Sequence, residues 1–452
     1  MILKKVPHLK GTVNVPGDYS ITQKAIAISS IAKGKSIIHG YLDSCSTNIT
    51  TAAFRAFGID ISDHADPDNE NVHSLYIYGN GLKGLSKPSG TINVENNSLL
   101  LRMLSGIIAS QSYTCSISGD AFIKSLSQES LIKPLRKMGS KITGFDDSDR
   151  APLTITGREL KGIQYVNIVS NDEIKSAVLL AGLYAKNKTT VYETRANHNH
   201  MEVLLDQFGA QIEFEHTENT HGKNFCDSAT VYNCFELNAR DIYVPGDFFY
   251  ASCFISAALI NPDCDIYLTN VGVNSTRIAY LNACIQMGGN IEIFNLKEVN
   301  GERIADLHIK TSELHALRIP AGSVTSMIDE LPLLCLIASK ANGTTIISGL
   351  TDIKEKDVDL LKYTLINLNN MGANISIEGE CLLIKGLNKL RAADIITNND
   401  HRLNMAMCIA GISSEQGISV PGSKSDGWTY LEDYSSIEYY YPEFLNDLAS
   451  LI

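Results

Sequence analysis

The sequence predicts an α/β (α+β) protein with two globular domains, each built from a repeated unit that combines helices with mixed sheets. Two observations lead to this prediction. A short glycine motif recurs along the chain at regular intervals, and a Val-Pro-Gly-Asp segment occurs twice. The length of 452 residues agrees with it, because single hydrophobic cores stop growing at about 250 to 300 residues.

The recurring motif consists of an aromatic residue or Met, then Gly, two variable residues and Ile. Its copies lie about 80 residues apart, a period typical of internal structural repeats, and their glycines are Gly58, Gly139, Gly209, Gly288 and Gly372. Each copy follows a helical pattern and precedes an alternating one, as where residues 281–286 lead to Ile291-Glu292-Ile293. Glycine is favoured just past a helix end, where a positive φ is needed. With room for a sixth copy, we expect three βαβαββ units in each domain.

The duplicated segment predicts where the chain crosses between the two domains. Val15-Pro16-Gly17-Asp18 and Val244-Pro245-Gly246-Asp247 each precede an apolar helical run. Their aspartates are suited to cap the start of that helix. We therefore expect a first domain at residues 18–243 and a second domain formed by residues 1–17 plus 244–452.

The composition favours a cytoplasmic protein that acts on small molecules. The excess of 50 acidic over 38 basic residues, a net charge of -12, disfavours nucleic acid and anionic membranes as partners. The ten cysteines contain no CxxC pair and are expected to be buried thiols in a reducing compartment. A secretory signal and a long apolar run are absent from the sequence. We expect a monomer with no cofactor.

Several segments resemble one enzyme family in the same order along the chain. They include the opening Val15-Pro16-Gly17-Asp18-Tyr19-Ser20, residues 134–139, 175–183 and 270–277, Ile328-Asp329-Glu330-Leu331-Pro332, and Asp400-His401-Arg402. This set resembles the 5-enolpyruvylshikimate-3-phosphate synthase family over essentially the whole chain. The resemblance implies the enolpyruvyl transferase fold, an inverse α/β barrel-like arrangement in which a ligand cleft lies between two domains of three units each.

In that family a ring hydroxyl of shikimate 3-phosphate adds to C2 of phosphoenolpyruvate, and phosphate is then eliminated. The resemblance implies catalytic roles for Asp329, Lys354, Glu355 and His401. It also implies that Ser20, Lys24 and Arg402 hold a carboxylate, although Lys24 stands where the family has arginine and lacks its bidentate fork. The alternative is that Lys24 and Arg402 pair with Asp18 or Asp400 as structural partners.

The cationic positions of the family are largely replaced in this sequence. Tyr19 stands in place of a lysine, the family arginines fall at Leu126 and Val358, and the phosphoenolpyruvate loop is Asn96-Asn97-Ser98-Leu99. Where the family has Ser-x-Gln, this chain has Asn171-Asp172-Glu173. A carboxylate about 4 Å from a phosphate oxygen is unfavourable by roughly 4 kcal/mol at an effective dielectric near 20. The predicted substrate-binding set is Tyr19, Ser20, Lys24, Asn171, Asp172, Glu173, Asn197 and Arg402.

Three functions remain open from the sequence. The first is an enzyme acting on a shikimate-like cyclic carboxylate by acid/base addition or elimination, without classical enolpyruvyl transfer. The second is an ordinary family member in which Lys175 or Lys124 supplies the missing charge. The third is an inactive paralogue that binds a metabolite.

Two other patterns have a structural interpretation. His198 and His200 lack an adjacent acid or thiolate cluster and predict no metal site. Asp172 and Glu173 also suit a helix N-terminus, where acids are stabilised by the macrodipole.

Overall fold

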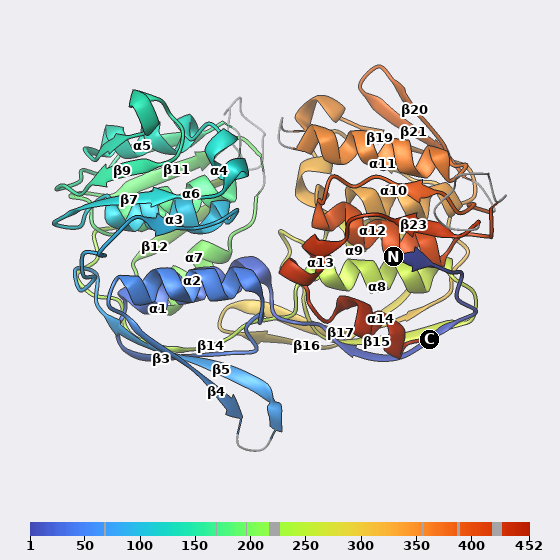
Figure 1. The fold of residues 1–452 in the computed structure, drawn as a ribbon, viewed down its shortest axis with the longest axis horizontal. Coiled ribbons are helices and arrows are strands. Elements are labelled where there is room, and N and C mark those ends of the chain that lie inside the picture. The colour runs from blue at the N-terminus through green and yellow to red at the C-terminus, as the bar shows by residue number, and fades with distance from the viewer. Residues whose placement is uncertain are drawn as a thin grey trace. The chain divides into compact units, whose positions relative to one another are not determined.

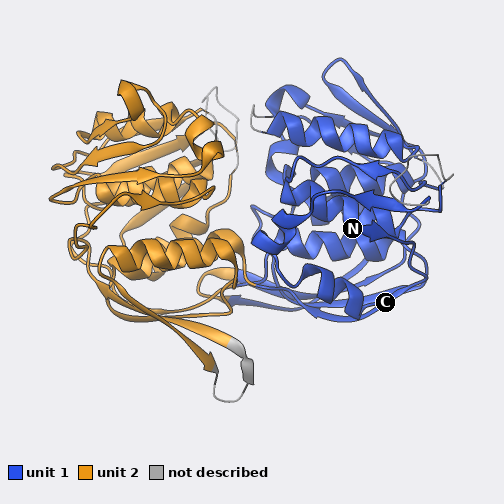
Figure 2. Ribbon diagram, viewed as in Figure 1, with its two compact units in different colours: residues 1–16, 245–298, 303–452 blue, residues 17–244, 299–302 orange. Residues whose placement is uncertain are grey.

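The computed structural model describes residues 1–66, 69–168, 170–195, 197–216, 227–353, 357–386, 389–417 and 427–452 (Figure 1). The chain forms two compact units (Figure 2). Unit 1 comprises Met1–Pro16, Pro245–Glu298 and Arg303–Ile452. Unit 2 comprises Gly17–Val244 together with the short segment Val299–Glu302. Each unit therefore contains segments that are distant in the sequence.

Unit 2 contains helices packed with three four-stranded sheets. The helices are α1 (Tyr19–Ile31), α2 (Cys45–Ala56), α3 (Ser98–Ile108), α4 (Ala121–Ser125), α5 (Glu129–Met138), α6 (Asp172–Gly182) and α7 (His200–Gln207). The first sheet has the order β14 (Asp241–Tyr243), β3 (Lys33–His39), β5 (Asn69–Asn80), β4 (Asp60–Asp66). The second is β6 (Ile92–Asn93), β7 (Thr114–Ser118), β9 (Leu153–Thr156), β8 (Lys141–Thr143). The third is β10 (Gln164–Asn167), β11 (Thr189–Glu193), β13 (Asp227–Val231), β12 (Ile212–His216).

Unit 1 repeats this arrangement. Its helices are α8 (Phe248–Ile260), α9 (Ala279–Gln286), α10 (Leu331–Lys340), α11 (Val358–Asn370), α12 (His401–Ile412), α13 (Ser435–Tyr440) and α14 (Phe444–Ser450). One sheet has the order β16 (Asn290–Val299), β17 (Glu302–Lys310), β15 (Cys264–Gly272), β2 (Leu9–Asn14). Another is β18 (Arg318–Ile319), β19 (Thr344–Ser348), β21 (Cys381–Lys385), β20 (Asn374–Glu378). The smallest is β1 (Ile2–Leu3), β23 (Thr429–Leu431), β22 (Asp394–Ile395).

Several of the four-stranded sheets share one pairing pattern. In the second sheet, β6 runs parallel to β7, β7 pairs antiparallel with β9, and β9 pairs antiparallel with β8. The third sheet repeats these three pairings with β10 to β13, and the β18 to β21 sheet repeats them in unit 1. The predicted α/β fold class with a repeated unit is confirmed.

The glycine motif marks the helix ends that the sequence predicts. Its glycines follow α2, α5, α7, α9 and α11, and the next element in each case is a strand, namely β4, β8, β12, β16 or β20. All of them have positive φ, with values of 84°, 112°, 86°, 92° and 91° for Gly58, Gly139, Gly209, Gly288 and Gly372. The conformational reason for glycine at these positions is thus confirmed.

Each unit is organised around fully buried helices. In unit 2 nearly every residue of α1, α3 and α6 is buried, and in unit 1 the same holds for α8, α10 and α12. Asp18 and Asp247 cap α1 and α8 as predicted, because their side chains accept hydrogen bonds from Ile21 N and Phe249 N. A Cβ atom on Gly106 of α3 would lie 2.2 Å from the Ala177 oxygen of α6, so these helices are in very close contact. In the described part of the chain, no helix has the length and apolarity needed to cross a bilayer.

Candidate functional site

The predicted site residues fall into both units. Unit 2 contains Tyr19, Ser20, Lys24, Asn171, Asp172, Glu173 and Asn197, and unit 1 contains Asp329, His401 and Arg402. Lys354 and Glu355 lie outside the described residues.

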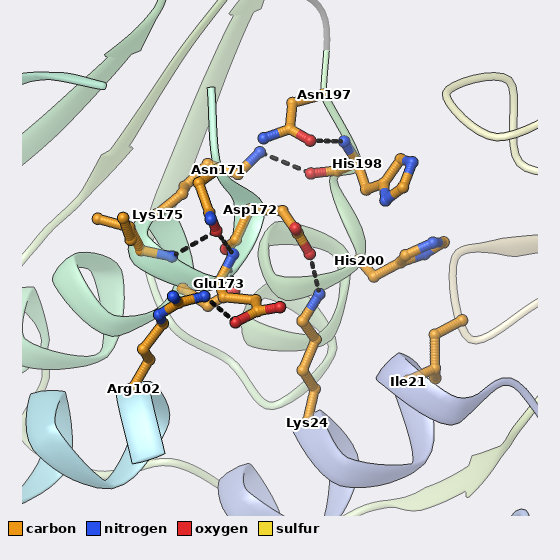
Figure 3. Close-up of polar contacts among 12 residues, drawn as sticks. Ile21, Lys24, Arg102, Asn171, Asp172, Glu173, Lys175, Asn197, His198 and His200 are labelled. Carbon is orange, nitrogen blue, oxygen red and sulfur yellow. Dashed lines mark hydrogen bonds and ion pairs between the residues drawn. The ribbon is translucent and has the colours of Figure 1, made fainter. Parts of the chain in front are cut away.

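In unit 2, two ion pairs join the start of α6 to α1 and α3 (Figure 3). We call Lys24, Ser98, Arg102, Asp172 and Glu173 the α6 cluster. Lys24 Nζ lies 3.3 Å from Asp172 Oδ2, and the Arg102 guanidinium pairs with Glu173. Ser98 Oγ donates a hydrogen bond of 2.9 Å to the same Glu173 carboxylate. Both acids therefore have specific partners.

The burial of these side chains explains why they pair. The side chain of Lys24 is 1% exposed and that of Arg102 is 11% exposed, whereas Asp172 and Glu173 retain 25% and 18% exposure. A buried cation without an acid partner would destabilise the fold, because its loss of hydration would not be compensated. The two positive and two negative formal charges cancel within the cluster. The two acids that the sequence predicted to repel a nearby phosphate are therefore compensated by Lys24 and Arg102.

Neutralising the two acids should free the two cations. We expect the double variant Asp172→Asn, Glu173→Gln to bind inorganic phosphate at least about tenfold more tightly than the wild type, since Lys24 and Arg102 would then face a helix N-terminus without internal anions. Isothermal titration calorimetry measures the change. The matched control is Glu129→Gln, which frees the exposed Lys133 and should leave phosphate affinity unchanged. Equal affinity of the double variant and the wild type would contradict this expectation.

The remaining predicted ligands of unit 2 are polar but uncharged. Burial raises the pKa of Tyr19 to about 12, against the lowering effect of hydrogen bonds with Ser46 and Gln23, so Tyr19 supplies no charge where the family has lysine. Ser20 lies partly exposed in the first turn of α1. Asn171 caps α6, because its side chain accepts from Glu173 N and Ile174 N. These groups can orient a ligand by hydrogen bonds alone.

A second, deeper network holds Lys175. Its ammonium lies 2.8 Å from Glu193 and 2.7 Å from Glu202, and the three side chains are at most 5% exposed. It also donates to the His198 carbonyl at 2.6 Å. Asn197 donates to Glu193 and to the Ser170 carbonyl, each at 2.8 Å. The charge of Lys175 is therefore matched by two buried acids within the core, whereas Lys124, the other candidate for the missing ligand charge, lies exposed on α4.

The two histidines of this region do not form a metal site with the residues that surround them. His200 Nδ1 lies 2.6 Å from Glu302 Oε1, and both side chains are buried. The His198 and His200 rings lie 6.0 Å apart. Within the described ranges, no three His, Cys, Asp or Glu side chains gather closely enough to hold a metal ion.

In unit 1, Arg402 binds three carboxylates. We call Arg277, Asp329, Glu330, Asp357, Asp400 and Arg402 the α12 cluster. Arg402 donates to Asp400 at 2.7 and 3.1 Å, to Asp329 at 3.0 Å and to Asp357 at 2.9 Å. Arg277 Nη1 lies 3.5 Å from the other Asp329 oxygen. The alternative that Arg402 pairs with Asp400 is realised, and Asp329 is held by two arginines.

The charges of this cluster are set by burial and by one another. Burial opposes the charge of Arg402, but Asp400, then Asp329 and Asp357, raise its pKa well above the usual range. Burial likewise opposes ionisation of Asp400, yet the charge and hydrogen bonds of Arg402 lower its pKa to about 2. Asp400 is therefore a carboxylate, and it also caps α12 by accepting from Arg402 N.

His401 lies among aromatic rings. It stacks on Tyr440 with ring centroids 3.8 Å apart and meets the edge of Phe249 at 6.0 Å. Burial, which outweighs the effect of Asp400, lowers the pKa of His401 to about 4. A neutral imidazole can accept a proton and donate one through its N–H. His401 is therefore uncharged near neutral pH, where a pKa of about 4 makes it a weak proton acceptor.

Sequence reasoning did not identify Arg102, Glu193 or Glu202 as partners. Arg102 had a usable signal, since it is the lone charge in the apolar run Leu99-Leu100-Leu101-Arg102-Met103-Leu104. A cation on the buried face of such a helix needs an acid nearby. Glu193 and Glu202 had no such signal, because each follows an ordinary strand or helix pattern.

The fold matches solved structures of enolpyruvyl transferases. EPSP synthase from Acinetobacter baumannii matches with a TM-score of 0.85 and 29% sequence identity, covering 100% of this chain and 97% of that chain. The enolpyruvyl transferase NikO from Streptomyces tendae matches with a TM-score of 0.74 and 16% identity, covering 99% and 96% of the two chains. At that identity the second match supports the fold alone.

Sequence comparison identifies the family. The family model EPSP synthase (3-phosphoshikimate 1-carboxyvinyltransferase) matches residues 3–448. The 3-phosphoshikimate 1-carboxyvinyltransferase of Geobacter sulfurreducens is 35% identical over 412 residues, which is 91% of this chain and 92% of that protein. The protein of the same name from Citrifermentans bemidjiense is 34% identical over 450 residues, 100% and 98% of the two chains. This chain therefore belongs to the EPSP synthase family, as its motifs predict.

Proposed function

We propose that this protein transfers an enolpyruvyl group from phosphoenolpyruvate to a ring hydroxyl of shikimate 3-phosphate, the acceptor named for its curated relatives. The main support is the charge balance of the α6 cluster. The sequence argued against a phosphorylated acceptor because Asp172 and Glu173 would repel it, and both acids have cationic partners at Lys24 and Arg102. Identity of about 35% over more than nine tenths of the chain adds to this support.

The proposal assigns the following roles to the predicted site residues. Asp329 contacts the reacting hydroxyl and is oriented by Arg277 and Arg402. His401, which is neutral, exchanges a proton with the reacting groups. Ser20 and Lys24 bind the ring carboxylate, and Lys24 then shares its charge between that ligand and Asp172. Lys354 and Glu355 keep the catalytic roles implied by the family resemblance.

A second candidate is the elimination or addition chemistry on an unphosphorylated shikimate-like ring. It is favoured because the cations of the described clusters already pair with carboxylates of the protein and so have less charge to offer a phosphate. These cations are Lys24, Arg102, Lys175 and Arg402. Leu126 and Val358 at the family arginine positions add no charge. This candidate requires no phosphoenolpyruvate.

A direct assay separates the two candidates. With shikimate 3-phosphate and phosphoenolpyruvate, the purified protein should release phosphate, and Asp329→Asn should lower kcat by about 10² to 10⁴, the usual contribution of a positioned acid/base group. The control Asp263→Asn removes an exposed carboxylate paired with Lys10 and should leave kcat unchanged.

Two other outcomes of this assay would each support a different function. Conversion of shikimate without phosphoenolpyruvate would establish the second candidate. Ligand-induced thermal stabilisation with no product by mass spectrometry would instead identify a metabolite-binding paralogue.

A further inference from the structure

Glu330 is a buried carboxyl group that the roles above leave unused. It directly follows Asp329 and forms the N-terminal boundary of α10. Its side chain is 0% exposed, and neither carboxyl oxygen makes a hydrogen bond with another residue in the described ranges, although the backbone N–H of Glu330 itself favours the charged form. Ionising a carboxyl that is buried in this way is costly. The geometry therefore favours the protonated, uncharged form.

Arg277 connects Glu330 to Asp329. Its Nη2 atom lies 3.7 Å from Glu330 Oε1, while its Nη1 atom lies 3.5 Å from Asp329 Oδ2. One guanidinium thus faces two neighbouring carboxyl groups. If both were ionised, two negative charges would compete for Arg277, and only Arg402, 3.0 Å from Asp329 Oδ1, would pair with Asp329 without competition from Glu330.

Among the described residues, the other titratable groups with the largest effect on Glu330 include no second cation. Asp247, which caps α8, adds a further negative charge. Burial raises the pKa of Cys284 on α9 to about 12, and burial raises that of Cys253 on α8 well above its usual value, so both thiols are uncharged. Burial raises the pKa of Glu330 to about 8; Arg277 and the backbone N–H of Glu330 itself lower it, and Asp329 and Asp247 raise it further.

We infer that Glu330 is a positioning residue, which as an uncharged side chain leaves the positive charge of Arg277 to hold Asp329. Asp329 keeps the full charge of Arg277 in addition to its pairing with Arg402 only while Glu330 keeps its proton. Loss of that proton at alkaline pH draws Arg277 toward Glu330 and disturbs the carboxylate that contacts the reacting hydroxyl. The role of Asp329 rests on the proposed function, whereas the charge state of Glu330 does not.

The charge state can be tested without activity. In the folded protein Glu330 keeps its proton up to about pH 8, while the unfolded chain releases it near 4.5. The contribution of this group to stability is therefore fully present below pH 4.5 and is lost as the pH rises toward 8. Glu330→Gln cannot titrate, so its Tm relative to the wild type should rise by several degrees between about pH 5 and about pH 9. Parallel Tm profiles would overturn the inference.

The coupling to Asp329 has its own readout. In Asp329→Asn the neighbouring negative charge is gone, so the pH at which Glu330 loses its proton should move to lower values in the melting profile. The Asp329→Asn, Glu330→Gln double variant should show no such transition. An unchanged midpoint in Asp329→Asn would show that the two groups are independent and would contradict the positioning role.

The effect on turnover completes the test. Glu330→Gln should retain kcat near neutral pH within about twofold and should move the alkaline limb of the kcat profile up by about one pH unit. A variant as inactive as Asp329→Asn at neutral pH would mean that Glu330 works as a carboxylate, against the inference. If the wild type shows no turnover, the proposed function fails, and the melting profiles still decide the charge of Glu330.

Discussion

Lys175→Met is expected to lower the free energy of unfolding by about 3 to 5 kcal/mol, the usual cost of removing one partner from a fully buried ion pair. Glu193 and Glu202 would be left as buried acids, with side chains 2% and 5% exposed. Burial already raises the pKa of Glu193, although Lys175 opposes this. Chemical denaturation at pH 7 measures the loss.

The control for this variant is Lys186→Met. Lys186 pairs with Glu159 on the surface, where both side chains are about 70% exposed, and such pairs contribute about 0 to 1 kcal/mol. The loss in Lys175→Met should also be smaller at about pH 5 than at about pH 8, because the orphaned acids can take up protons. A loss below about 1 kcal/mol would mean that the network tolerates an unpaired acid.

Arg402→Ala is expected to destabilise the protein by about 3 kcal/mol, at the lower end of the range for a broken buried pair. The variant would leave Asp329, Asp357 and Asp400 together without their shared cation. Asp329 and Asp400 are 33% and 26% exposed, so water moderates their repulsion. Only Asp357, at 2% exposure, is left fully desolvated.

The destabilisation caused by Arg402→Ala should become smaller at low pH. Arg402 lowers the pKa of Asp400 to about 2 although burial opposes ionisation, so this pairing stabilises the fold above about pH 4 and loses its effect as the pH falls toward 2. The difference between wild type and Arg402→Ala should therefore shrink on acidification. Arg402→Lys keeps the positive charge but loses the bidentate guanidinium fork, so its free energy of unfolding should lie between those of the wild type and Arg402→Ala. A difference that grows at low pH would rule out this account.

The fold was predictable because its signals are local. A glycine with positive φ after each helix, and an aspartate that caps α1 or α8, can be recognised within a few residues of sequence. The same motifs recur along the chain, so each copy supports the others. The family followed from segments in a fixed order, which likewise requires no knowledge of contacts.

The charge balance of the site was not predictable in the same way. Lys24 and Asp172 are 148 residues apart in the chain, and Arg102 and Glu173 are 71 residues apart. Their pairing depends on how α1, α3 and α6 pack, which a single sequence does not reveal. The acids were visible as charges but not as members of pairs, and the pairing changes the effect that they are expected to have on a phosphate. Glu330 has no signal of its own in the sequence, since the burial of its carboxyl is a tertiary property.

The contact between Gly106 and Ala177 also constrains how this sequence can change. Gly106 lies one helical turn beyond Arg102, and Ala177 lies one turn beyond Glu173. The distance between the two helix backbones at this crossing therefore determines whether the side chains of Arg102 and Glu173 can reach each other. Arg102 and Glu173 could exchange places or be replaced jointly during divergence. A larger residue at position 106 would instead push the helices apart and separate the pair without altering either charge, so the charge balance of the α6 cluster can change through an uncharged residue one helical turn away from it.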